Sequence, residues 1–273
     1  MTYLAVWLLA LGAGDLARPG AELGGRRPSW LPVLVSVPVA VLSWPLLGQR
    51  GGWHLLALLG IVLLLVVWAR SSAAAVSSGL RARDHGDGEG DGDDRAHDPS
   101  AAAAALLRSA GRHRLVAGAS LLVGLVALFA LAGVDAAAGG PLARWWGSLG
   151  LPRLGRVPLD RALMVLAVML AQIGTGNVVV RLVLDAAGAH SQPGVLRGGR
   201  WLGPMERVFV VGLALAGQAT AASVVIAAKG ILRFPELQDQ RGPGQRIDVV
   251  TEYFLLGSFT SWLVALGCAL LAL

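Results

Sequence analysis

Apolar residues occur in seven blocks along the chain, separated by polar or charged segments. The blocks cover Tyr3–Ala13, Trp30–Leu47, Trp53–Ala69, Leu115–Val134, Ala162–Leu184, Val208–Ile231 and Tyr253–Leu273. Most approach the roughly 17–25 residues that a helix needs to cross the hydrocarbon core of a bilayer. The pattern predicts an all-α, polytopic transmembrane helical bundle with six or seven spans. The first block is short: its helix would cross only if it continued through Asp15 and Leu16, and otherwise it would lie at the interface.

Proline and glycine interrupt the second block. Pro32, Pro38 and Pro45 predict a kinked or broken helix, because each proline removes a backbone donor. Only Gly48–Gly52 separates this block from the third. We therefore expect these two blocks to form a tight hairpin.

A long polar segment, Arg81–Ser100, divides the chain. It reads RARDHGDGEGDGDDRAHDPS and has almost no large apolar side chain. Such a segment cannot bury enough surface to offset the entropy of ordering, so we expect a disordered acidic loop over 81–100. It would separate N-terminal transmembrane helices in residues 1–80 from C-terminal ones in residues 101–273.

Composition supports a membrane protein and excludes some other classes. Hydrophobic residues make up 55% of the chain and charged residues 15%, and the mean hydropathy is +0.64. The net charge of +6 comes from basic residues between the apolar blocks, which is typical of membrane topology signals; nucleic-acid binding is not expected. All but one of the 23 basic residues are arginine. With abundant alanine and glycine, this indicates a high-GC bacterial genome and a bacterial plasma membrane.

One polar connection between blocks is rich in tryptophan. Leu142–Pro152 reads LARWWGSLGLP and combines two tryptophans with an arginine. Tryptophan and arginine are common at the headgroup level of membranes, so this segment predicts an interfacial element.

The fifth block carries polar side chains at helical spacing. Asn177, Arg181 and Asp185 follow one another at four-residue steps, which places them on one helix face. Gly174 and Gly176 leave room for a neighbouring backbone. Two interpretations remain open. The strip lines a cavity, or Asn177 makes an interhelical hydrogen bond while Arg181 and Asp185 reach the aqueous boundary.

The sixth block has the most unusual pattern. Arg207, Gln218 and Lys229 are evenly spaced by nearly three helical turns, so one continuous helix would point all three the same way. Gln218 would then lie near the middle of the membrane. Two interpretations remain open for this face. It borders a polar cavity, or it packs on a neighbouring helix through small residues while the charged residues lie at the helix ends.

Charged residues also mark the ends of the last two blocks. Glu206 follows Pro204, where a carboxylate would favour a helix start, and ion pairing with Arg200 or Arg181 is the alternative. A further set could form a charge network at one membrane face: Lys229, Arg233, Glu236 and Glu252.

The C-terminal part resembles a known family. The runs GGRWLGPMERVFVVGLALAGQATAASVVIAAKGILRF and TEYFLLGSFTSWLVAL are similar to uncharacterised bacterial multi-pass membrane proteins known only as a domain of unknown function. The similarity covers about residues 174–273, with Met205 where leucine is usual and Gly230 where serine is common. It implies a membrane location and no known activity. The shared positions are Gly198, Gly199, Arg200, Glu206, Arg207, Gly217, Gln218, Lys229, Arg233, Phe234, Glu252 and Tyr253.

No catalytic, cofactor or metal motif is evident. The sequence therefore favours a protein without catalytic activity but does not exclude an enzyme. Cys268 is the single cysteine and lies inside the last block. The first hypothesis is a non-enzymatic membrane assembly or accessory protein, with the bilayer and a membrane-protein partner or second copy around it. The alternatives are a small-solute or ion transporter using the polar faces of the fifth and sixth blocks, and a membrane enzyme acting on lipid. Eight residues carry the polar signal: Asn177, Arg181, Glu206, Arg207, Gln218, Lys229, Arg233 and Glu252.

Overall fold

The computed structural model describes residues 1–18, 30–49, 51–86, 99–134, 137–150, 157–187, 199–239 and 247–273. Within these ranges, the side chains of 80–86, 99–103, 199–201, 229–230, 232–239 and 247–254 are not described. Every regular element in the described ranges is a helix, which confirms the all-α prediction. The α-helices are α1 (Thr2–Leu16), α2 (Leu31–Leu46), α3 (Gly52–Gly86), α4 (Pro99–Ala130), α5 (Gly140–Ser148), α6 (Leu159–Ile173), α7 (Thr175–Ala186), α8 (Gly199–Leu215), α9 (Ala219–Asp239) and α10 (Ile247–Ala272).

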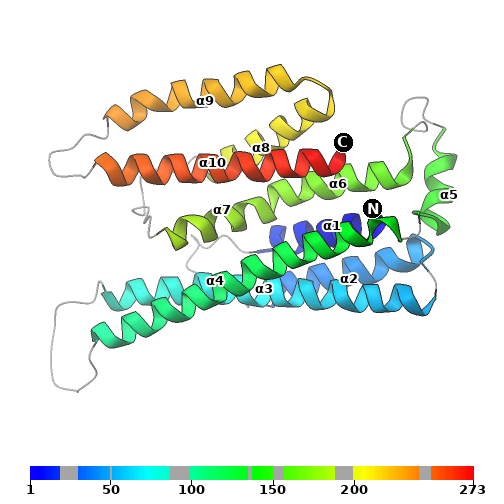
Figure 1. The fold of residues 1–273 in the computed structure, drawn as a ribbon, viewed down its shortest axis with the longest axis horizontal. Coiled ribbons are helices and arrows are strands. Elements are labelled where there is room, and N and C mark those ends of the chain that lie inside the picture. Colours follow the sequence, from blue (N-terminus) through cyan, green and yellow to red (C-terminus); the bar gives the residue numbers. More distant parts are fainter. Residues whose placement is uncertain are drawn as a thin grey trace.

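The helices form a layered bundle. Figure 1 shows α3 and α4 side by side along one edge and α8, α9 and α10 along the other, with α1 and α6 between them. The helix α1 packs on both α2 and α6, so helices from the N-terminal and C-terminal regions share one core.

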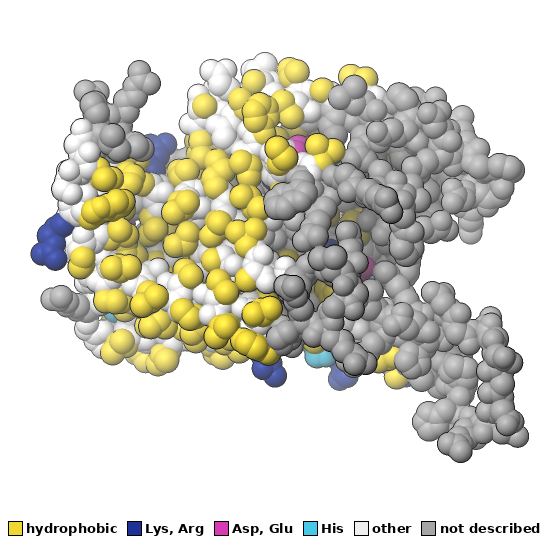
Figure 2. Space-filling view, turned by 180° about the vertical axis from the view of Figure 1, so that it is seen from behind, with side chains coloured by type: hydrophobic (Ala, Val, Ile, Leu, Met, Phe, Trp, Pro, Cys, Tyr) yellow, Lys and Arg dark blue, Asp and Glu magenta, His cyan; other side chains and the backbone are white. Residues whose placement is uncertain are grey.

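Three helices contain segments long and apolar enough to cross a membrane. These segments are Gly52–Gly79 in α3, Ala104–Gly133 at α4, and Leu255–Ala272 in α10, and the bent pair α6–α7 would make a fourth. Figure 2 shows apolar side chains spread over one broad face of the molecule. The apolar helices are compatible with a membrane protein, but helix length in the described ranges supports three or four spans, not the expected six or seven.

The first helix is a core helix. Each residue from Thr2 to Leu8 is buried, and the helix is apolar on all sides, which is typical of a helix enclosed by others. Although α1 does continue through Asp15 and Leu16, its 15 residues extend only about 22 Å, short of the roughly 30 Å of a bilayer core. It is therefore too short to cross such a core alone. Its burial among other helices also does not fit the interfacial position that was the alternative prediction.

The helices on either side of the predicted hairpin and acidic loop differ in smaller ways from expectation. The helix α2 is continuous through Pro38, so it is not broken, and it packs against α3 as the predicted hairpin. Helix α3 runs to Gly86 and α4 begins at Pro99, so helix extends into the predicted acidic loop from both sides. The remainder of that loop, 87–98, lies outside the described residues.

Two apolar blocks that predicted single helices are divided by glycine. The fifth block is the pair α6 and α7, bent by 42° at Gly174. The sixth block ends α8 at a turn centred on Gly217, where φ is +73°. The Gly217 N–H donates to Ala214 O at 3.0 Å and the Gln218 N–H to Leu213 O at 2.8 Å, which is the Schellman pattern that ends a helix. The chain then turns back as α9, so Val208–Ile231 is a helical hairpin and not one span (Figure 1).

Candidate functional site

The break between α6 and α7 is stabilised by side chains. Ending a helix leaves carbonyl groups without their backbone donors. Arg207 of α8 supplies two N–H groups to the Gln172 carbonyl, from Nη2 at 2.9 Å and from Nε at 3.1 Å. Asn177 Nδ2 donates to the Ile173 carbonyl at 3.3 Å. The last carbonyls of α6 therefore keep hydrogen-bond partners despite the break.

The Arg207 guanidinium also connects the neighbouring helices. Its Nη2 donates to Asn177 Oδ1 in α7 at 2.5 Å, and its Nη1 donates to Ser261 Oγ in α10 at 3.1 Å. The residue is only 2% exposed. A planar guanidinium suits this role because its donors are held in a fixed fork. Arg207 thus joins α8 to α6, α7 and α10; we call Gln172, Asn177, Arg207 and Ser261 the Arg207 cluster.

Glycines at the break allow two helices to approach it from different sides. A Cβ on Gly176 would lie 2.7 Å from Nε of Arg207. A Cβ on Gly174 would lie 2.6 Å from the carbonyl oxygen of Gly12 in α1. The predicted close approach of a neighbouring backbone is therefore confirmed at Gly174, whereas at Gly176 the neighbour is the Arg207 side chain. The break is packed between α1 and the Arg207 side chain.

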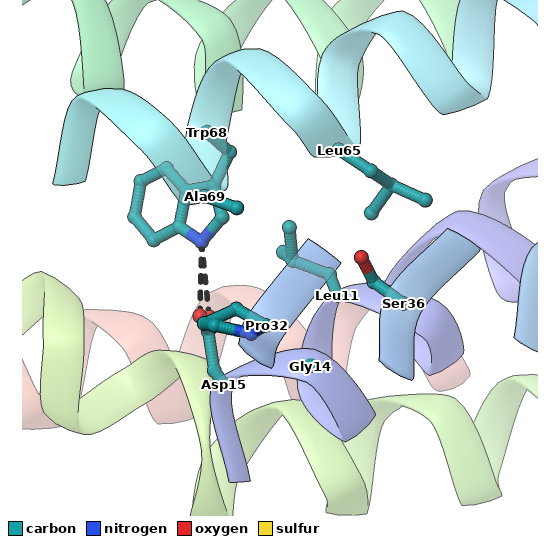
Figure 3. Close-up of a pocket in the computed structure, with 8 residues that line it drawn as sticks. All are labelled: Leu11, Gly14, Asp15, Pro32, Ser36, Leu65, Trp68 and Ala69. Carbon is teal, nitrogen blue, oxygen red and sulfur yellow. Dashed lines mark hydrogen bonds between the residues drawn. The ribbon is translucent and has the colours of Figure 1, made fainter. Parts of the chain in front are cut away.

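A second buried charge lies on α1 beside this break. Asp15 accepts hydrogen bonds from Trp68 Nε1 of α3, at 3.0 Å to Oδ2 and 3.2 Å to Oδ1 (Figure 3). Arg18 pairs with Asp15 Oδ1 at 2.7 Å through Nε, and its Nη2 donates to Ser72 Oγ at 2.7 Å. The carboxylate is almost fully buried, so these donors replace the water that it loses. We call these four residues the Asp15 cluster.

A small hollow adjoins Asp15 where α1, α2 and α3 meet. It has no room for an enclosed water molecule. Ser36 Oγ borders it without a hydrogen-bond partner in the described structure (Figure 3). The hollow is therefore a packing gap rather than a ligand cavity. Its lining residues are Leu11, Gly14, Asp15, Pro32, Ser36, Leu65, Trp68 and Ala69.

The predicted polar strip on α7 divides between two roles. Asn177 takes part in the Arg207 cluster, which is the interhelical hydrogen bond that one interpretation expected. Arg181 and Asp185 lie further along α7 as an ion pair with an N···O distance of 3.9 Å, and the Arg181 side chain is 39% exposed. Such an exposed pair contributes little to stability.

Two expectations for the sixth block are wrong. Gln218 lies exposed in the turn between α8 and α9, and the three-residue face with Arg207 and Lys229 does not exist because the helix ends at Leu215. Glu206 does not open a helix, since α8 already begins at Gly199. Instead, Glu206 Oε1 accepts a hydrogen bond from Trp262 Nε1 of α10 at 3.1 Å.

The remaining candidates, Lys229, Arg233 and Glu252, have side chains outside the described part of the structure. The sequence pattern missed four participants of the two clusters: Arg18, Trp68, Ser72 and Ser261. Asp15 was noted only as a possible continuation of the first helix. Serine hydroxyl and tryptophan indole groups are common in apolar helices and gave no signal of their own. Among the described side chains, no three His, Cys, Asp or Glu residues gather where a metal ion could bind.

No protein-family model, curated protein or solved structure matches this chain. The similarity of its C-terminal part to uncharacterised membrane proteins therefore stays a prediction.

Proposed function

We propose that the protein is a multi-pass protein of the bacterial plasma membrane with a non-enzymatic role, as an assembly or accessory component. The observation that carries this proposal is the use of the Arg207 guanidinium. A charge inside an apolar bundle is costly and usually marks a functional pathway. Here the four hydrogen bonds of Arg207 go to α6, α7 and α10 of its own chain, which supports a structural clamp rather than a ligand site.

The outer surface is the part available for interaction. On α4, Leu122, Val123 and Phe129 are each more than half exposed, and α3 presents Leu59 and Leu63 in the same way. An apolar surface of this kind is covered by lipid or by another membrane protein. We expect the partner to be a membrane-protein subunit or a second copy of this chain.

The span count follows from helix length. We propose three or four complete crossings, formed by α3, α4, α10 and the bent pair α6–α7. The core helix α1 and the two helices of the α8–α9 hairpin then complete the bundle, and none of them is a complete crossing by itself.

The assembly role can be tested with crosslinking in native membranes. The tagged chain, expressed at its native level, is crosslinked and separated by blue-native electrophoresis, and the purified chain is unfolded thermally. Arg207→Gln should lower both the complex yield and the unfolding temperature, because the clamp holds the bundle in shape. Arg181→Gln is the matched control, since its ion pair is partly exposed, and should leave both near wild type. A wild-type chain recovered only as an uncrosslinked monomer would overturn the proposal.

Solute transport is the second candidate, and one observation favours it. The break between α6 and α7 lies between the buried charges of Asp15 and Arg207. Discontinuous helices whose broken ends face the bundle interior form the substrate sites of many transporters.

Flux assays separate the two candidates. The purified chain in liposomes is given gradients of ions, small organic anions and amines. Transport predicts flux that Asn177→Ala abolishes while the unfolding temperature stays within a few degrees of wild type. An assembly role predicts no flux from the wild-type chain under any of these gradients.

A further inference from the structure

The short helix α5 connects α4 to α6 in the sequence and is exposed. None of its residues is buried, and Trp145 is 55% exposed. A nine-residue helix is not stable by backbone hydrogen bonding alone, so α5 requires contacts outside itself. Arg144 is also exposed on this helix.

Both ends of α5 are fixed to the bundle. The Gly139 N–H donates to the Leu47 carbonyl at the end of α2 at 3.0 Å. Trp146 Nε1 donates to the Val157 carbonyl, just before α6, at 3.0 Å. Gly140 has φ +68° and packs so closely on Gly48 that a Cβ would lie 2.5 Å from its nitrogen. The exposed face of α5 therefore has a defined position.

That position coincides with the end of two membrane-spanning segments. The apolar segment at α4 ends at Gly133, and the one in α3 begins at Gly52, close to the α5 attachment at Gly48. Figure 1 shows α5 at this end of the bundle, beside the α2–α3 turn and the start of α6. Trp53, in the first turn of α3, is 56% exposed at the same end. Two exposed tryptophans at the end of apolar spans are typical of the interface belt of membrane proteins.

The charge at this end favours an anionic partner. Between Gly133 and Ala162 the sequence contains four arginines and two aspartates. One of the aspartates, Asp160, is engaged internally, accepting from Thr2 Oγ1 at 3.1 Å and from the Ala138 N–H at 2.7 Å. Arg144 and Arg161 are both exposed. Basic side chains beside an interface attract the phosphate groups of anionic lipids.

We propose that α5, together with Trp53, forms a binding surface for anionic phospholipid headgroups at one face of the membrane. The indole of Trp145 lies in the headgroup layer, and Arg144 binds lipid phosphate. This inference rests on the membrane location in the proposed function, but not on the assembly role.

The test places one fluorescent label in α5 and one in a span. In a Cys268→Ala background, Ser148→Cys labels the exposed end of α5 and Leu122→Cys labels the exposed face of α4. The labelled chains are reconstituted in phosphatidylcholine vesicles with or without phosphatidylglycerol. Three quenchers are compared: a nitroxide on the lipid headgroup, a nitroxide in the middle of the acyl chain, and aqueous iodide. The Ser148 label should be quenched most by the headgroup nitroxide and the Leu122 label most by the acyl-chain nitroxide.

Lipid selectivity is measured by quenching of the Ser148 label with brominated lipids. Brominated phosphatidylglycerol should compete better than brominated phosphatidylcholine. Arg144→Gln should weaken that preference about fivefold, the effect of one basic residue near a charged surface. Arg108→Gln is the matched control, because Arg108 is exposed on α4 far from α5.

Three outcomes would overturn the inference. Quenching of the Ser148 label by iodide alone would place α5 in water, and quenching by none of the three agents would show that protein covers it. Equal preference for both lipids, unchanged by Arg144→Gln, would remove the anionic site. If iodide also quenched the Leu122 label, the membrane location in the proposed function would fail as well.

Discussion

Gly176 and Arg207 fit together only because Gly176 has no side chain. A Cβ at Gly176 would lie 2.7 Å from Nε of Arg207, 3.1 Å from Cζ and 3.2 Å from Nη2. These are the atoms that hold the guanidinium against the Gln172 carbonyl. The position of one glycine in α7 therefore determines whether the charge on α8 can reach the break.

Gly176→Ala should displace the Arg207 side chain and destabilise the protein. Overpacking of a dense site costs about 1–3 kcal/mol, and the lost hydrogen bonds place this variant at the upper end. The measurement is chemical unfolding of the purified chain in mild detergent. Gly118→Ala in α4 is the control, since no atom lies within 4 Å of its added Cβ, and it should be neutral or stabilising by about 0.5–1 kcal/mol. Equal stability of the two variants would contradict the clamp.

Gly217 should tolerate side chains poorly for a different reason, namely its backbone conformation. Its φ is +73°, but no atom lies within 4 Å of an added Cβ, so the strain is purely local. Gly217→Ala should lower the free energy of unfolding by about 1 kcal/mol. Gly212→Ala in α8, also without close atoms but with ordinary φ, should raise it by about 0.5–1 kcal/mol. Gly217→Asn should lose less than Gly217→Ala, because asparagine tolerates this conformation; matching losses would argue against the turn.

Asp15 and Trp68 should show coupled stability. Trp68→Phe removes the indole donor while keeping an aromatic ring, and Asp15→Ala removes its acceptor. A double-mutant cycle over these two changes should give a coupling energy of about 1.5–3 kcal/mol, the range for a hydrogen bond to a charged group. Trp30→Phe is a suitable control for losing an indole, because Trp30 is 52% exposed. Additive losses for Asp15 and Trp68 would show that the contact does not stabilise the bundle.

The crossing of α1 and α6 should not tolerate an added side chain at Gly12. A Cβ on Gly12 would lie 2.8 Å from the backbone nitrogen of Ala171, and backbone atoms cannot move aside. Gly12→Ala should therefore cost at least about 3 kcal/mol or prevent folding, visible as aggregation in fluorescence-detected size-exclusion chromatography. Gly60→Ala in α3, with open space around it, should elute as wild type. A monodisperse Gly12→Ala variant would show that α1 does not pack on the α6 backbone at Gly12.

The helix breaks were not predictable from apolar content. The blocks Ala162–Leu184 and Val208–Ile231 are both long enough and apolar enough for single spans. Breaking a helix at Gly174 becomes affordable only when Arg207, 33 positions away in the chain, supplies the missing donors. The glycines at 174 and 176 did indicate a close approach, but not which side chain would fill it.

The sequence by itself determined that the chain is helical and that its helices are largely apolar. Long apolar blocks with few charges can hydrogen-bond their backbone in a membrane only as helices, so the all-helical architecture followed directly. The tertiary structure alone decided which helices are core and which face outward. The helix α1 has the apolar content of a membrane anchor, yet it is enclosed because Gly12 lets α6 pack directly on its backbone. The tertiary structure likewise decided the partners of Arg207. A buried charge needs hydrogen-bond partners, and only helix packing determines which three helices supply the acceptors.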